Sequence, residues 1–62
     1  MENNTERWID ADEIAAYLGV RPETVRTWIR EKEMPAQKIG RRWKFKVTEV
    51  DHWVKSGKSA IR

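Results

Sequence analysis

The chain has 62 residues, of which 13 are Lys or Arg and 10 are Asp or Glu, and it contains no cysteine. A chain of this length forms one domain with a small interior, which leaves little room for a catalytic pocket. Without cysteine it forms neither disulfides nor thiolate metal sites, and a reducing compartment suits it. No apolar run approaches the ~20 residues of a membrane-spanning helix, so we expect an intracellular protein.

The charges are segregated along the chain. Residues 1–13 contain one basic and five acidic residues, a net charge of −4, whereas residues 21–46 contain nine basic and three acidic residues, a net charge of +6. Segregation of this kind indicates a surface that faces a polyanion. The alternative is a basic face that is merely solvated.

A first helix is predicted over residues 11–18. Asp10 and Glu13 have the spacing of a capping box, so the acids at this helix start are interpreted as caps rather than as a catalytic pair. Ile14 and Leu18 lie on the apolar stripe of the helix, and Gly19 suits the left-handed residue at its end.

A second helix is predicted over residues 22–31, where Pro22 suits the first helical position. Its apolar stripe comprises Val25, Trp28 and Ile29. The opposite side carries Arg26 and Arg30, whose like charges at i, i+4 disfavour an isolated helix and therefore suit an anion-binding face. Two helices joined by a short turn with a glycine form a helix-turn-helix pattern.

A β-hairpin and a third helix are predicted in the remainder of the chain. The hairpin runs from a strand at 37–39 through the turn 40–42 to a strand at 43–47, in which apolar and basic residues alternate. The apolar face (Trp43, Phe45 and Val47) is expected to cover the helices, and the basic tip to project as a wing. Thr48 is expected to cap a helix over 49–56, with Asp51 at the capping-box position.

The predicted fold class is therefore mainly α with a β-hairpin (α+β), in the order helix, turn, helix, hairpin wing, helix. Residues 1–7 are expected to form a flexible N-terminus, residues 8–57 the domain, and residues 58–62 a basic tail. The four tryptophans, Phe45 and Tyr17 are expected to supply the bulk of the small core. For Trp28 and Trp43, core packing is favoured over a role as base-stacking platforms.

The pattern resembles the excisionase-family, MerR-like winged helix-turn-helix domain over about residues 8–55. The segments that carry the resemblance are Leu18-Gly19-Val20, Thr24-Val25, Trp28-Ile29, Met34-Pro35-Ala36, Lys38-Ile39-Gly40-Arg41-Arg42-Trp43 and Trp53. The resemblance implies a small DNA-binding protein whose second helix enters the major groove while the wing reaches the adjacent minor groove or the phosphates. It also implies a cytoplasmic, nucleoid-associated protein of a prokaryote.

The chain departs from the family pattern at two positions. The family usually has Ser or Thr immediately before the second helix, where this chain has Arg21, so the start of the helix depends on Pro22. The family usually has Gly near the end of that helix, where this chain has Lys32. Either Lys32 adopts the left-handed conformation, at a cost of roughly 1 kcal/mol, or the helix continues for another turn.

Ten residues are candidates for DNA contact. Guanidinium groups suit guanine O6/N7 and phosphate, and a hairpin tip with two arginines suits a narrow minor groove. For Glu23, acceptance from cytosine N4 and a favourable interaction with the helix dipole are equally consistent with the sequence. The candidates on the second helix are Arg21, Glu23, Thr24, Arg26, Thr27 and Arg30, and those on the wing are Lys38, Arg41, Arg42 and Lys44.

We therefore expect sequence-selective binding of double-stranded DNA, as an excisionase-type architectural factor or a small transcriptional regulator. The expected partners are duplex DNA and a recombinase or other protein, with the chain acting as a monomer or assembling cooperatively on DNA. The alternative is a protein–protein adaptor that uses the same basic face on an acidic partner. No catalytic residue, metal ligand or cofactor is predicted, and the single His52 is interpreted as a surface residue.

Overall fold

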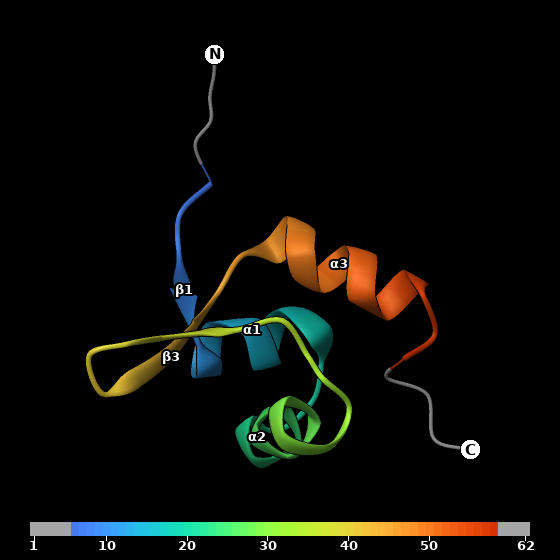
Figure 1. Cartoon of the computed structure of the whole chain (residues 1–62), viewed down its shortest axis with the longest axis horizontal. Helices are drawn as coiled ribbons and strands as arrows, with labels where there is room; N and C mark the ends of the chain where they lie inside the picture. The colour runs from blue at the N-terminus through green and yellow to red at the C-terminus, as the bar shows by residue number, and fades with distance from the viewer. Residues whose placement is uncertain (1–5, 59–62) are drawn as a thin grey trace.

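The computed structural model describes residues 6–58 of the chain. Its elements, in chain order, are β1 (Ile9–Asp10), α1 (Ala11–Leu18), α2 (Pro22–Glu31), β2 (Gln37–Ile39), β3 (Arg42–Phe45) and α3 (Val47–Lys55). The β2–β3 hairpin extends well beyond the three helices (Figure 1). The three helices and the small antiparallel hairpin agree with the predicted α+β class. Residues 1–5 of the predicted flexible N-terminus and residues 59–62 of the predicted basic tail lie outside the described residues.

Every helix, the hairpin and the loop after α2 contribute to one hydrophobic core. The buried side chains are Ile14, Ala15, Val25, Met34, Phe45, Val50 and Trp53. No polar or charged side chain among the described residues is buried with them. Phe45 of β3 is buried among apolar side chains of all three helices, which holds the hairpin in a fixed position relative to them.

The predicted bounds of α1 and the capping box at its start are confirmed. The Asp10 carboxylate accepts a hydrogen bond from the Glu13 N–H at 3.2 Å, and the Glu13 carboxylate accepts one from the Asp10 N–H at 3.4 Å. At the other end Gly19 has φ +74°, and the N–H of Val20 donates to the carbonyl of Ala15. Glycine adopts this conformation without a steric penalty, so the chain reverses within a few residues and begins α2.

The predicted bounds of α2 are also confirmed, but its C-terminal end differs from both expectations for Lys32. Arg21 precedes the helix without a side-chain cap, and Pro22 occupies the first turn. Lys32 has φ −122°, and the left-handed residue is Glu33, with φ +59°. The Lys32 N–H still makes the helical i→i−4 hydrogen bond to the carbonyl of Trp28. The helix ends because Glu33 is left-handed, which turns the Met34 N–H back to the same Trp28 carbonyl.

The sheet has a third strand that the sequence analysis did not predict. β1 pairs antiparallel with β3, and the strand order is β1-β3-β2. Ile9 lies opposite Phe45, and Asp10 opposite Lys44. β1 stops there because Asp10 is also the N-cap of α1, so the chain leaves the sheet at the next residue.

The predicted start of α3 is wrong. Val47, expected at the end of the second strand, is the first helical residue, and Thr48 lies inside the first turn rather than capping it. Both the N–H and the hydroxyl of Thr48 donate to the carboxylate of Glu6. A carboxylate at this position satisfies helix N–H groups and complements the helix dipole, so Glu6 performs the function expected of Thr48. Asp51 has no capping role and instead accepts a hydrogen bond from the Tyr17 hydroxyl at 2.8 Å.

The aromatic residues contribute less to the core than expected. Phe45 and Trp53 are buried, while Trp28 and Trp43 are half-buried and pack against the core. Trp8 is 38% exposed and Tyr17 52% exposed, so these two do not supply core volume. The ring of Trp8 instead contacts the Lys46 ammonium, which lies 4.5 Å from the ring centroid.

Candidate functional site

The outward face of α2 carries most of the candidate residues of that helix. Val25 is fully buried and anchors the helix, so the residues on the opposite side face solvent. Arg21, Glu23, Arg26 and Arg30 are exposed, whereas Thr24 and Thr27 are half-buried. The Thr27 hydroxyl donates to the carbonyl of Glu23 at 3.1 Å, so it is engaged within the helix. Arg30 lies 3.8 Å from the Glu31 carboxylate in a solvent-exposed pair, an interaction that contributes little.

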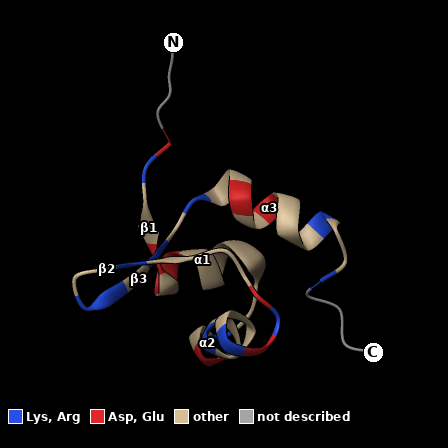
Figure 2. Ribbon diagram, viewed as in Figure 1, with Lys and Arg blue, Asp and Glu red and all other residues tan. Residues whose placement is uncertain are grey.

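The hairpin presents a basic tip. Gly40 and Arg41 form the turn, and Gly40 has φ +64°, the conformation that a two-residue turn of this kind requires at its first position. Arg41 and Arg42 are both exposed. Figure 2 shows basic residues along β3 and at the turn, at the end of the hairpin that projects from the helices. Lys38 lies over the ring of Trp43, with its ammonium 5.0 Å from the ring centroid.

Basic residues of α2 and of the hairpin line one cleft of about 340 Å³. Arg26 of α2 and both hairpin arginines, Arg41 and Arg42, line it. The other residues of its wall are Asp10, Ala11, Asp12 and Trp43. Three arginines, one from α2 and two from the hairpin, therefore line one concave surface, here called the arginine cleft.

The arginine cleft exists because β1 is short. The pairing of β1 with β3 ends at Asp10 and Lys44, and the chain then turns into α1. The flank of β3 at Arg42 and Trp43 is therefore not covered by β1, and the start of α1 forms the opposite wall. The basic side chains were predicted from the charge pattern, but this meeting of α1, α2 and the hairpin was not.

Two acidic residues in the cleft wall were interpreted only as helix caps. Asp10 is engaged by the N–H of Glu13, while Asp12 is exposed in the first turn of α1. These two aspartates lie in the same wall as three arginines because α1 begins next to the part of β3 that β1 does not cover. The sequence signal for it is the Asp-Ala-Asp run directly after an apolar pair, Trp8-Ile9, which marks where the chain enters the helix.

The remaining candidate residues lie outside the cleft wall. Arg21, Glu23, Thr24, Thr27 and Arg30 lie along α2 and the residue before it, and Lys38 and Lys44 lie on the hairpin strands. Lys44 is half-buried between its cross-strand neighbours Asp10 and Gln37. The cleft therefore unites three of the ten candidates, while the others flank it along α2 and the hairpin.

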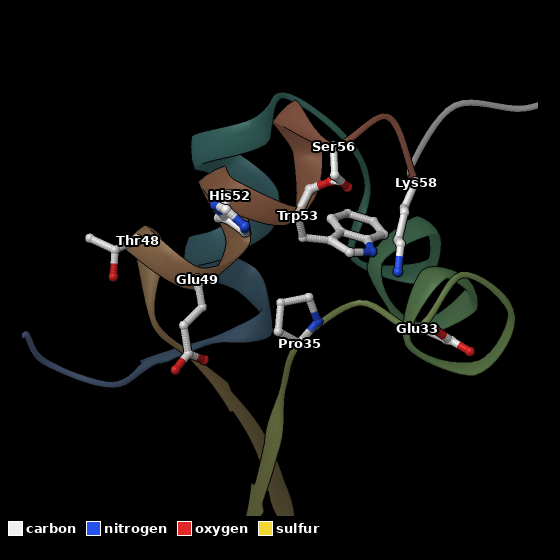
Figure 3. Close-up of a pocket in the computed structure, with 8 residues that line it drawn as sticks. All are labelled: Glu33, Pro35, Thr48, Glu49, His52, Trp53, Ser56 and Lys58. Atoms are coloured by element: carbon white, nitrogen blue, oxygen red, sulfur yellow. Dashed lines mark hydrogen bonds between the residues drawn. The ribbon is translucent and has the colours of Figure 1, made fainter.

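A larger groove of about 540 Å³ lies elsewhere, between α3 and the loop that follows α2. Figure 3 shows Thr48, Glu49 and His52 along α3, with Pro35 facing the Trp53 indole across the groove. The groove is wide open, and its charged residues are Glu33, Glu49 and Lys58. We favour the smaller arginine cleft as the candidate site, because three arginines from α2 and the hairpin line it, whereas the larger groove is lined by one basic residue, Lys58.

Two other kinds of site were sought in residues 6–58. No group of three or more His, Cys, Asp or Glu side chains in residues 6–58 is arranged to hold a metal ion. None of the helices in this range has the length and hydrophobicity needed to cross a membrane. Two pKa values are displaced: hydrogen bonds from Thr48 lower that of Glu6, and the hydrogen bond to Asp51 raises that of Tyr17. Neither residue lines the arginine cleft.

Comparison with protein families gives one result. A family model described as a helix-turn-helix domain matches residues 8–58, most of the chain and nearly all of the part described here. Comparison with curated proteins and with solved structures finds no match.

Proposed function

Because the chain belongs to the helix-turn-helix domain family, we propose that it binds double-stranded DNA, with α2 in the major groove and the β2–β3 hairpin at the adjacent minor groove or phosphates. The observation that supports this proposal is the arginine cleft, which Arg26 of α2 and Arg41 and Arg42 of the hairpin line together. Basic groups on two projections around one concavity suit a polyanion that passes between them.

Each element has a distinct role in the proposed complex. The guanidinium groups of Arg26 and Arg30 suit guanine O6/N7 or phosphate, and Glu23 suits cytosine N4. Arg41 and Arg42 suit a phosphate or the negative potential of a narrow, A·T-rich minor groove. Arg21, Thr24, Lys38 and Lys44 are assigned to phosphates, which fix the position of the protein but carry no sequence information.

We further propose that the protein acts as an excisionase-type architectural factor or as a small transcriptional regulator on a prokaryotic nucleoid. The proposed DNA-binding form is a monomer or an assembly that forms on DNA. Selection of duplexes from a random pool, followed by footprinting, separates the two roles: several adjacent sites favour the architectural factor, and one palindromic site favours a dimeric regulator.

The salt dependence of binding to a labelled duplex tests the proposal directly. A protein that contacts about five phosphates has a slope of log K against log salt near −4 to −5. Arg26→Ala and Arg30→Ala are each expected to weaken binding by roughly 1–3 kcal/mol if they read bases. Arg41→Ala with Arg42→Ala is expected to weaken binding more evenly across sequences.

Lys55→Ala serves as the matched control. Lys55 is an exposed basic residue at the end of α3 and lines neither the arginine cleft nor the larger groove. Its removal lowers the net charge by the same amount as Arg26→Ala but is expected to change the affinity little. A slope near zero, or equal losses in Lys55→Ala and Arg26→Ala, would contradict DNA binding through this face and favour an adaptor with an acidic protein partner.

A further inference from the structure

The wall of the arginine cleft opposite the hairpin is acidic. Asp10 and Asp12 come from the start of α1 and line the same space as Arg26, Arg41 and Arg42. Asp10 is committed to the N-cap, where its carboxylate accepts the N–H of Glu13. Asp12 is exposed on the first turn of α1 and has no part in that capping box. It is therefore the acidic side chain of the cleft that most directly meets whatever enters.

The residues that line the cleft have a small positive net charge. Three arginines and two aspartates line it, and their charges sum to +1. A DNA phosphodiester carries a charge of −1 and therefore balances the cleft, whereas a second phosphate would place an uncompensated negative charge beside Asp12. Like charges repel most strongly at low salt, because the screening length is about 10 Å at 0.1 M and grows as the salt concentration falls.

We propose that the arginine cleft is a seat for one phosphodiester of the strand that passes between α2 and the hairpin. The negative charge of Asp12 repels this phosphodiester and so limits the affinity with which the cleft holds it. This inference rests on the proposed DNA binding. Asp12 lowers the affinity for duplexes of any sequence, because the phosphate it repels is present in all of them. Its effect is to keep sequence-independent binding weak while leaving base contacts along the rest of α2 unchanged.

Asp12→Asn removes the charge with little change in shape. We expect it to bind both a random duplex and a selected duplex about 3- to 10-fold more tightly at low salt, and the gain to shrink as salt rises. Asp12→Glu retains the charge and is expected to bind like the unmodified chain. Glu49→Gln is the matched control, because Glu49 is an exposed acid on α3 that lines the other groove. It makes the same change in net charge and is expected to leave affinity within about 2-fold.

Affinity measured by fluorescence anisotropy, with circular dichroism on every variant, decides the matter. Equal affinities for Asp12→Asn and Glu49→Gln would overturn the inference, as would weaker binding by a folded Asp12→Asn, which would make Asp12 a contact rather than a restraint. If Asp12→Asn fails to fold, Asp12→Ser, which also removes the charge, takes its place: tighter binding than by Glu49→Gln supports the inference, and equal or weaker binding overturns it. Failure of the unmodified chain to bind any duplex at low salt would overturn the proposed function itself, which is a different result.

Discussion

The indole N–H of Trp53 donates a hydrogen bond to the carbonyl oxygen of Lys32 at 3.0 Å and so joins α3 to the end of α2. Lys32 is the first residue after the helix, where carbonyl groups lack helical partners. The centroid of the Trp53 ring also lies 5.6 Å from that of the Trp28 ring, and the two rings are tilted relative to each other, an arrangement that aromatic pairs prefer. One side chain thus satisfies a backbone acceptor and holds the proposed recognition helix against α3.

Trp53→Phe tests the weight of that hydrogen bond. Phenylalanine retains an aromatic ring but leaves the Lys32 carbonyl without its donor, so we expect a loss of about 1–3 kcal/mol in the free energy of unfolding. Trp8→Phe is the control, because Trp8 is exposed and its main contact is with the Lys46 ammonium. It is expected to cost less than about 1 kcal/mol. Chemical denaturation measures both, and equal losses would contradict the special role of Trp53.

A double-mutant cycle tests whether the arginine cleft acts as one site. If Arg26 and the pair Arg41 and Arg42 hold the same phosphate, Arg26→Ala combined with Arg41→Ala and Arg42→Ala should show a coupling of about 0.5–3 kcal/mol in duplex binding. Arg30 supplies the comparison, because it lies on the same helix but outside the cleft wall. Its combination with the hairpin variants should be additive within about 0.5 kcal/mol. Coupling of equal size in both cycles would argue against a shared seat in the cleft.

The bounds of α1 and α2 were predictable because their signals are local. Asp10 and Glu13 lie three residues apart and cap the same helix, and Gly19 and Pro22 mark the turn within one short stretch. The start of α3 was not predictable in the same way. Thr48 has the residue type of a cap, but the carboxylate that satisfies its N–H belongs to Glu6, 42 positions earlier. A contact so distant in sequence leaves no mark in the pattern around Thr48.

The candidate site shows the same division. The charge pattern identified Arg26, Arg41 and Arg42, because segregated basic residues are visible in the sequence itself. Their meeting in one cleft depends on β1, a two-residue strand too short to show alternation, whose partner Phe45 is far away in the chain. Asp12 was therefore interpreted only as part of a helix start, although the fold places it in the cleft wall.

Two left-handed residues should respond oppositely to substitution. At Gly40, with φ +64°, an added Cβ meets nothing within 4 Å, so the cost of Gly40→Ala is backbone strain alone, about 1–2 kcal/mol. At Glu33, with φ +59°, the strain is already present. Glu33→Gly relieves it but increases the entropy of the unfolded chain by a somewhat smaller amount, so we expect no loss and a gain of up to about 1 kcal/mol. Thermal unfolding measures both, and a clear loss in Glu33→Gly would contradict the assigned conformation.

The hydrogen bonds between Glu6 and Thr48 should make stability depend on pH in the acid range. The side-chain and backbone hydrogen bonds from Thr48 hold the pKa of Glu6 below its ordinary value of 4.5. A carboxyl whose pKa is lower in the folded state contributes stability above its unfolded pKa and loses that contribution as pH falls through the folded pKa. The contribution of Glu6 is therefore complete above about pH 4.5 and declines below it.

Glu6→Gln removes this titration, because glutamine carries no ionisable proton. Its free energy of unfolding should therefore fall less steeply than that of the unmodified chain as pH drops below 4.5, although it should be lower at neutral pH, where the charged cap is lost. Thr48→Ala removes the hydroxyl donor but keeps the N–H donor, so it should make the fall of the free energy of unfolding below pH 4.5 partly less steep. Glu33→Gln, an exposed acid in the loop after α2, is the control and should leave the slope intact. Parallel curves for Glu6→Gln and the unmodified chain would show that α3 begins without help from Glu6.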